Sequence, residues 1–157
     1  MSNMSEPPLV VDLPTRRATT RLASRLAAVI EAGDLVVLSG ELGAGKTFLV
    51  RAVCRALGLS ARVRVTSPTF SLVHEYATRP PIAHADLYRV EVEREVRDLG
   101  LDAQRDDGMA LLVEWGERFV EVLGGDALVV MLSTDPRRAS LSATGEQSRS
   151  RLAALRK

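Results

Sequence analysis

The 157-residue sequence predicts a three-layer α/β fold, with a mainly parallel central sheet and antiparallel strands at an edge. Two apolar runs, 35–38 and 109–113, lack the polar alternation of half-exposed strands, which is typical of strands covered on both faces. Other segments repeat apolar residues at helical spacing. A glycine-rich turn over 40–45 joins the first apolar run directly to one of these helical segments. Strands and helices that alternate in this way indicate a sheet with helices on both sides.

Composition and length restrict the class of protein. Apolar residues form 46% and charged residues 26% of the chain, as in folded globular domains and unlike disordered ones. The apolar runs are far shorter than the roughly 20 residues of a membrane span, so no membrane association is expected. The lone cysteine, Cys54, excludes an internal disulfide, and no Cys/His cluster has the spacing of a zinc site. A reducing, cytoplasmic location is therefore expected.

The first elements are predicted from apolar spacing and from the residues that end helices. Residues 1–14 are expected to form a disordered lead, since they lack the basic-then-apolar pattern of a secretory signal. An amphipathic helix is predicted over about 15–32, because apolar residues recur there every three or four positions. A strand over 35–39 and a helix over 46–57 follow, and Gly58 provides the helix C-terminal cap.

The later elements are predicted with the same rules. Strands are expected over 62–66, 70–76, 82–88, 109–113, 127–132 and 138–143. Helices are expected over 92–99 and 117–123, with a polar connection over 100–108. No internal repeat or long linker divides the chain, so a single domain is expected.

The charge is unevenly spread along the chain. The net charge is +1, which argues against a protein that binds nucleic acid over its whole surface. Residues 137–157, however, hold six basic residues and one acidic residue. We therefore divide the chain into the lead, a domain over 15–143 and a basic C-terminal tail over 144–157. The tail is either a solvated terminus or a direct contact with RNA or a partner.

A phosphate-binding motif, G-x-x-x-x-G-K-[ST], is matched at every fixed position. The matching residues are Gly40, Glu41, Leu42, Gly43, Ala44, Gly45, Lys46 and Thr47. Glycines allow backbone N–H groups to surround phosphates, and the N-terminus of the following helix favours their negative charge. Lys46 is expected to bridge the β- and γ-phosphates, and the Thr47 hydroxyl to bind Mg²⁺. The motif thus predicts a P-loop nucleotidase that uses Mg²⁺, with Glu41 to Thr47 around the nucleotide.

Such a site also needs a carboxylate at the end of a neighbouring strand. Two residues qualify, because Asp86 ends the strand predicted from Ile82 and Glu114 ends a more apolar one. Composition favours Glu114 and leaves open whether Asp86 is functional or only an exposed strand end.

Four blocks of sequence, in this order, resemble the TsaE (YjeE) family, the small bacterial P-loop ATPase needed to make threonylcarbamoyladenosine in tRNA. They are GELGAGKT at 40–47, SPTF at 67–70, HADLYR at 84–89 and VEW at 113–115. General P-loop kinases share only the first block, so the resemblance is specific. It extends from about Ala18 to Ala143.

The resemblance implies roles for individual residues. Lys46, Asp86 and Glu114 are the catalytic residues that it implies. Glu114 and Thr47 hold the metal, and Asp86 organises the waters around the metal or the attacking water. Further nucleotide-site residues that it implies are Thr19, Thr69, Trp115 and Arg137.

Some of these positions keep an alternative. Thr19 could instead be a helix N-terminal cap. Arg137 departs from the family pattern, since Pro136 precedes it where the family often has glycine. His74 and His84 have no partner arrangement typical of general bases, so structural or surface roles are expected for them.

The implied activity is Mg²⁺-dependent ATP hydrolysis, which is slow without partners because no arginine is placed on the γ-phosphate. It supports formation of the threonylcarbamoyl group on adenosine of tRNAs that read codons starting with A. The implied partners are the TsaB and TsaD proteins, and tRNA is reached indirectly through the complex, without binding to DNA. A small-molecule P-loop kinase is the alternative, although the 40 residues after Leu59 lack a paired arginine motif. A non-catalytic nucleotide-binding regulator is a third class, disfavoured by the intact motif.

Overall fold

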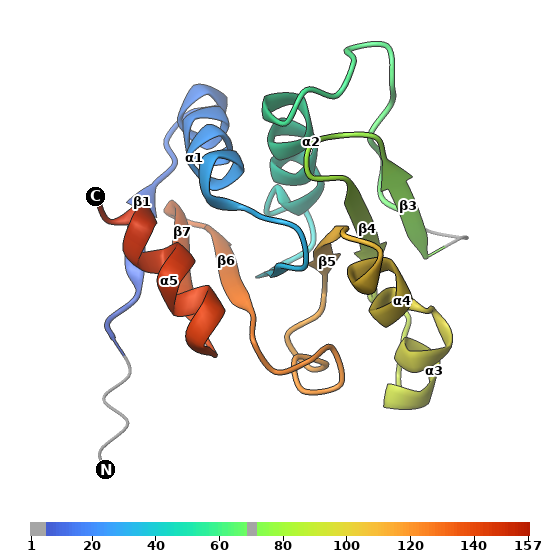
Figure 1. Cartoon of the computed structure of the whole chain (residues 1–157). Coiled ribbons are helices and arrows are strands. Elements are labelled where there is room, and N and C mark those ends of the chain that lie inside the picture. Colours follow the sequence, from blue (N-terminus) through green and yellow to red (C-terminus); the bar gives the residue numbers. More distant parts are fainter. Residues whose placement is uncertain (1–5, 69–71) are drawn as a thin grey trace.

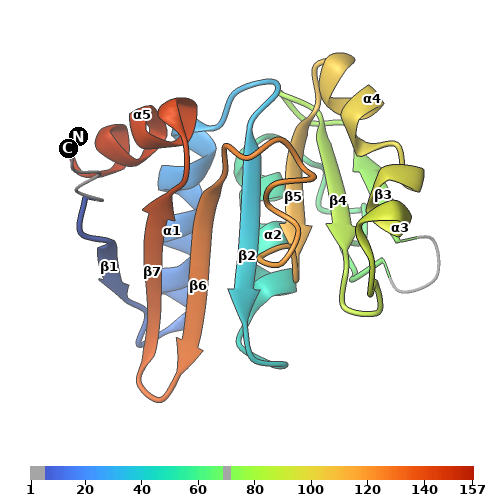
Figure 2. The ribbon, with the colours of Figure 1, turned by 90° about the horizontal axis from the view of Figure 1, so that it is seen from below.

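One seven-stranded sheet extends through the computed structural model, which describes residues 6–68 and 72–157 (Figures 1 and 2). Its strands are β1 (Leu9–Asp12), β2 (Leu35–Gly40), β3 (Val73–Tyr76), β4 (Ile82–Asp86), β5 (Ala110–Glu114), β6 (Leu128–Thr134) and β7 (Arg137–Ala143). Their order is β1-β7-β6-β2-β5-β4-β3. The four central strands β6, β2, β5 and β4 are parallel, and β1, β7 and β3 add antiparallel strands at the two edges. The predicted fold class is confirmed.

Helices cover both faces of this sheet. They are α1 (Arg16–Val29), α2 (Lys46–Ala56), α3 (Glu93–Asp98), α4 (Leu101–Asp106) and α5 (Glu146–Leu155). In Figure 2, α1 and α2 lie behind the sheet, whereas α3 and α4 lie in front of it. On β2, Val36 and Leu38 belong to the core under α1, α2 and α5, and Leu35 and Val37 to the opposite core. Burial on both faces explains why this strand is apolar without alternation.

The core between the sheet and helices α1, α2 and α5, called the helix core here, also contains Cys54, which is buried as expected. Burial raises the pKa of its thiol to about 12, so the side chain is a small apolar group rather than a nucleophile. No helix in the described ranges combines the length and the apolar character that crossing a bilayer requires.

Two predicted boundaries of the domain are wrong. The lead, 1–14, contains β1, whose residues pair with β7, for example Leu9 with Leu141. The tail, 144–157, contains α5, whose Leu152 and Leu155 are buried in the helix core. Residues 9–12 complete the sheet edge and residues 146–155 complete the helix layer, and these distant contacts are not visible in local composition.

Three local predictions also fail. Residues 62–66 form no strand, because the Arg55 guanidinium binds the carbonyls of Ser60 and Val63 and holds a turn. The expected polar connection, 100–108, contains α4, which packs through buried Leu101. The expected helix, 117–123, is a series of turns whose last carbonyl, that of Leu123, accepts a hydrogen bond from Arg105 at 2.5 Å. In the first case a side chain nearby in sequence decides the backbone conformation, and in the other two a contact between distant residues overrides local composition.

Candidate functional site

The phosphate-binding motif forms the turn between β2 and α2 at the carboxyl ends of the parallel strands. Gly43 and Gly45 have φ angles of 83° and 104°, in the left-handed region that favours glycine. At Gly40 a Cβ atom would lie 2.4 Å from the carbonyl oxygen of Leu132, so only glycine fits beside β6. The glycines of the motif are thus required by the backbone of this turn.

Lys46 begins α2 and its side chain turns back over the loop. Its ammonium group donates to the carbonyl oxygens of Gly40 at 2.5 Å and Glu41 at 2.9 Å. The same nitrogen lies 4.0 Å from the centre of the Trp115 ring, a cation–π contact. Burial lowers the pKa of Lys46, and the nearby carboxylate of Glu114 partly opposes this effect. The loop therefore holds a single, partly desolvated cation at its mouth.

Thr47 and Glu114 lie in contact, as the resemblance implied. The Thr47 hydroxyl is 3.0 and 3.1 Å from the two carboxylate oxygens of Glu114, at the end of β5. Glu114 is only 3% exposed, so this carboxylate is held inside the protein close to the phosphate-binding loop. A hydroxyl and a carboxylate side by side form a hard oxygen donor pair suited to Mg²⁺.

A third residue, His84, joins this pair and was not predicted as part of the site. Its Nε2 atom lies 2.5 Å from Glu114 Oε2, and its side chain is fully buried. Its Nδ1 atom has no hydrogen-bond partner among the described residues, so Nε2 carries the hydrogen that reaches the carboxylate. The sequence did contain a signal, because His84 is two positions before Asp86 on one strand and therefore shares its face.

We expect this contact to matter for stability. Replacing His84 with Leu leaves a buried carboxylate with one donor fewer, and the free energy of unfolding should fall by about 2 kcal/mol. The variant His84→Gln keeps an N–H donor near the position of Nε2 and should lose less than half of that. Urea unfolding measures both variants. Equal losses for Leu and Gln would show that only packing, and not the hydrogen bond, stabilises Glu114.

Asp86 lies beside Glu114 across the parallel strands β4 and β5, at the same level in the register. One of its carboxylate oxygens accepts from the hydroxyl of Ser67, and the other accepts from the backbone N–H of Tyr88 at 2.9 Å. The two acidic residues left open by the sequence are therefore neighbours. Asp86 links the loop before β3 to the strand that carries His84.

Trp115 follows Glu114 and has φ of 60°, a left-handed conformation that is unusual for an aromatic residue. Such backbone conformations cost roughly 1–3 kcal/mol and concentrate at functional sites. The backbone N–H of Trp115 donates to the carbonyl of Leu38 at 3.0 Å. The centre of the Trp115 ring lies 4.9 Å from that of the Tyr88 ring. These contacts hold the indole over Lys46.

A cavity of about 360 Å³ adjoins the loop on the side of β6 and β7. It is lined by Leu13, Pro14, Thr15, Arg16, Thr19, Gly43, Ala44, Gly45, Phe48, Leu132, Ser133 and Arg137. Thr19 and Arg137, predicted from different ends of the chain, thus line the same cavity as the loop. Thr19 is not a helix cap, because Thr15 caps α1 by accepting from the N–H of Ala18 at 3.1 Å. Phe48, Arg16 and Ser133 line the cavity without having been predicted.

The remaining predicted residues are placed as follows. Glu41 contributes its carbonyl to Lys46, and Leu42 is 78% exposed at the tip of the loop. Ala44 is buried and lines the cavity. Thr69 lies outside the described residues. His74, for which a structural or surface role was expected, is on β3 with its ring edge toward Tyr76.

The donor atoms fit a magnesium ion that is shared with phosphates. Within 6–68 and 72–157, no group of three or more His, Cys, Asp or Glu side chains is arranged to hold a metal alone. Mg²⁺ in nucleotide sites uses one or two protein oxygens together with phosphate oxygens and water. Thr47 and Glu114 supply that number of protein donors.

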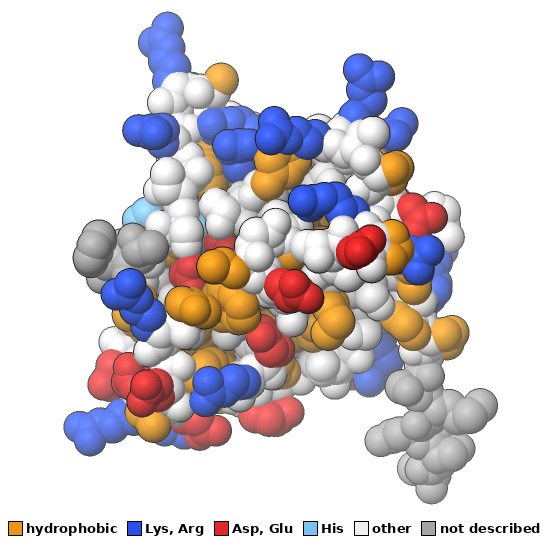
Figure 3. Space-filling view, turned by 180° about the vertical axis from the view of Figure 1, so that it is seen from behind, with side chains coloured by type: hydrophobic (Ala, Val, Ile, Leu, Met, Phe, Trp, Pro, Cys, Tyr) orange, Lys and Arg blue, Asp and Glu red, His pale blue; other side chains and the backbone are white. Residues whose placement is uncertain are grey.

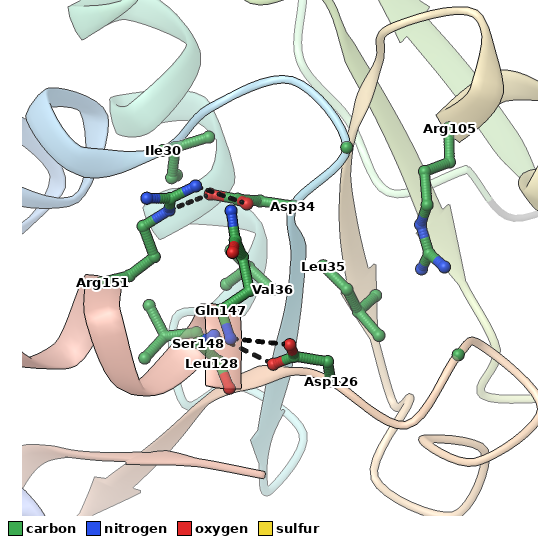
Figure 4. Close-up of a pocket in the computed structure, with 12 residues that line it drawn as sticks. Ile30, Asp34, Leu35, Val36, Arg105, Asp126, Leu128, Gln147, Ser148 and Arg151 are labelled. Atoms are coloured by element: carbon green, nitrogen blue, oxygen red, sulfur yellow. Dashed lines mark hydrogen bonds and ion pairs between the residues drawn. The ribbon is translucent and has the colours of Figure 1, made fainter. Parts of the chain in front are cut away.

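A second, smaller cavity of about 90 Å³ lies at the other end of β2 and contains none of the predicted residues (Figure 4). Two of its charged side chains are paired with each other, since Arg151 donates to both oxygens of Asp34, at 2.8 and 3.2 Å. Asp126 accepts from the N–H groups of Gln147 and Ser148 at the start of α5. Burial alone would raise the pKa of Asp126, but the bonds from Ser148 and Gln147 hold it below its usual value. This cluster attaches α5 to the sheet.

Comparisons with known proteins identify the family of the chain. The family model described as "Threonylcarbamoyl adenosine biosynthesis protein TsaE" matches residues 13–141. The chain is 47% identical to the tRNA threonylcarbamoyladenosine biosynthesis protein TsaE of Streptomyces coelicolor over 111 residues, which cover 68% of this chain and 73% of that protein. It is 36% identical to the protein of the same name in Bacillus subtilis, covering 82% of each. The crystal structure of Bacillus subtilis YdiB superposes with a TM-score of 0.79 at 27% identity and covers 99% of this chain and 97% of that one.

Proposed function

The chain belongs to the TsaE family, a family of tRNA threonylcarbamoyladenosine biosynthesis proteins, and from this premise we propose that it supports this modification by hydrolysing ATP with Mg²⁺. The observation that carries the proposal is the contact of Thr47 with Glu114 at the mouth of the phosphate-binding loop. A kinase acting on small metabolites is not favoured, because the relatives are named for tRNA modification.

Each residue of the site has a part in this activity. The backbone of Gly43 to Lys46 surrounds the phosphates, and the Lys46 ammonium exchanges its carbonyl partners for phosphate oxygens. The Thr47 hydroxyl and the Glu114 carboxylate hold the metal, and His84 fixes the orientation of that carboxylate. When bound, Mg²⁺ neutralises charge on the phosphate oxygens.

Asp86 has a separate role in the proposal. Its carboxylate accepts hydrogen bonds from Ser67, in the loop before β3, and from the backbone N–H of Tyr88. From this position it orients a water for attack on the γ-phosphate. The cavity that contains Thr19, Phe48 and Arg137 has room for the nucleoside. Trp115 lies over Lys46 and excludes water from the phosphates.

We further propose that TsaB and TsaD are the partners in the cytoplasm and that hydrolysis is slow without them. The arginines that line the cavity, Arg16 and Arg137, lie on the side of Thr19 and Phe48 and away from Asp86. An additional group that stabilises the transition-state charge is therefore expected from a partner or from a rearranged loop.

The test is nucleoside analysis of tRNA from cells depleted of this protein. Loss of threonylcarbamoyladenosine is expected, with rescue by the native chain and none by the variant Asp86→Asn, which keeps the size of the side chain. Rescue by Asp86→Asn would show that the tRNA modification does not need hydrolysis by this protein. The protein would then be a nucleotide-binding regulator. Unchanged modification after depletion would contradict the proposal as a whole. Phosphate release by the purified protein should rise when TsaB and TsaD are added.

A further inference from the structure

A row of exposed arginines follows the outer side of α1, α2 and the loop after α2. The row, called the arginine face here, comprises Arg17, Arg21, Arg51, Arg62 and Arg64. Arg17 and Arg21 are one helical turn apart on α1, and Arg51 is on α2. Arg16 lies at its edge, where it and Arg51 flank the ring of Phe48 at 5.9 and 5.0 Å. This contact joins the two helices into one surface.

None of these five arginines has a carboxylate partner in the part of the chain that the structure describes. Ion pairs there involve other residues: His84, Arg97, Arg138 and Arg151. The reason is visible in the sequence, since the segments 14–30 and 42–68 contain nine basic residues and no Asp or Glu. The positive charge of this face is therefore not neutralised within the protein.

The charge is segregated on the molecule. Figure 3 shows Lys and Arg side chains gathered along the upper part of the view, over α1 and α2, and Asp and Glu side chains mainly below them. The opposite side of the sheet carries acidic residues on and around α3 and α4, among them Glu91, Glu95, Asp102 and Asp106. A chain with a net charge of only +1 thus has one strongly basic face.

We propose that the arginine face binds the phosphate backbone of RNA directly, in addition to any contact made through partner proteins. Guanidinium groups donate paired hydrogen bonds that match phosphate oxygens, and clustered arginines on one face are the electrostatic footprint of nucleic-acid binding. The biosynthetic process of the family acts on tRNA, which makes RNA the occupant that the chemistry and the family both support. Three of the five arginines lie on helices, Arg17 and Arg21 on α1 and Arg51 on α2, so little backbone ordering is needed there on binding.

The inference extends the predicted role of basic residues from the C-terminal tail to the helices. Of the tail residues, Arg151 is paired with Asp34 and Glu31, and Arg156 donates to the backbone of Pro7. These guanidinium groups are hydrogen-bonded within the protein. On the arginine face, Arg51 makes a cation–π contact with Phe48, and the other four guanidinium groups make no hydrogen bond or ion pair with the residues that the structure describes. The face also lies apart from Lys46 and Glu114, so RNA binding and hydrolysis are separable by mutation.

The test is fluorescence anisotropy of a labelled, unmodified tRNA transcript at several KCl concentrations. The wild-type protein should bind the transcript with roughly micromolar affinity near 50 mM KCl. The logarithm of the association constant should fall with log[KCl] with a slope of about −4, as expected for five phosphate contacts. The variant R17E/R21E/R62E reverses three charges, and none of the three residues lines the cavity beside the phosphate-binding loop. It should bind at least about 30-fold more weakly, with a slope closer to zero by about 3.

The matched control is R94E/R118E/R149E, which makes the same change in net charge at exposed positions elsewhere. Its affinity for the transcript should stay within about 3-fold of that of the wild type. If both triple variants lost the same affinity, net charge alone would explain the binding, and the proposal would be overturned. So would an absence of binding at 50 mM salt, or equally tight binding of poly-glutamate, which would assign the face to an acidic protein. Should the reversal variant not unfold cooperatively, R17Q/R21Q/R62Q is measured instead, with a loss of about 10-fold expected. ATP hydrolysis of the test variant should be unchanged, so failure of RNA binding leaves the proposed hydrolysis intact.

Discussion

Replacing Lys46 with Ala should weaken ATP binding by roughly 100- to 1,000-fold and remove hydrolysis. The ammonium group is the single cation at the mouth of the loop, held by two carbonyls and the Trp115 ring, and it is the group placed to meet phosphates. Charge-assisted hydrogen bonds of this kind contribute about 1.5–3 kcal/mol each, and we expect Lys46 to make at least two of them with phosphate. Calorimetric titration with Mg-ATP measures the loss.

The chain offers a matched control, since Lys157 is its other lysine and lies at the exposed C-terminus. Lys157→Ala should bind ATP like the wild type. Both variants should keep the thermal unfolding transition of the native protein, because no apolar group of the core is removed. ATP affinity that is unchanged in Lys46→Ala would contradict the assignment of the loop as the phosphate site.

Replacing Glu114 with Gln should lower hydrolysis by roughly 100-fold and abolish its response to Mg²⁺, while ATP affinity changes little. The amide keeps the size of the side chain and can still accept from Thr47 and His84. It lacks the negative charge that a hard cation requires. Removing one preorganised charged group from a catalytic site costs a factor of this size. Phosphate release measured against Mg²⁺ concentration tests the prediction.

Glu117→Gln is the control, since this exposed carboxylate is close enough to raise the pKa of Lys46 but touches neither Thr47 nor His84. Its hydrolysis should stay within about 2-fold of the wild type. If Glu117→Gln were the more defective of the two, the metal would be held at a different place. Normal Mg²⁺ dependence in Glu114→Gln would likewise remove Glu114 from the metal site.

Much of the fold and the phosphate loop follows from the sequence alone. The run 35–38 is apolar on both faces because both faces are covered, and that pattern is a local property of the chain. The motif over 40–47 is equally local, since Gly43 and Gly45 are required by the backbone angles of one short turn. Such features are predictable because the residues that impose them are adjacent in sequence.

Other predictions failed where the deciding contact is distant in sequence. The predicted lead contains β1, which pairs with β7, and the predicted tail contains α5, which is attached by an ion pair between Arg151 and Asp34 across 117 positions. The expected strand over 62–66 fails for a local reason instead, because Arg55 binds the carbonyls of Ser60 and Val63, five and eight positions along the chain. The partners of β1 and α5 lie outside any window of local sequence.

The site shows the same division. The sequence determined the phosphate loop and supplied two candidate carboxylates, and composition favoured Glu114 but left open whether Asp86 is functional. The tertiary structure decided that both lie at one level of adjacent parallel strands and that Thr47 contacts Glu114. It also brought His84 to Glu114, and Thr19 and Arg137 to one cavity. These groups meet because parallel strands end at the same edge of the sheet, a property of the whole fold rather than of any segment.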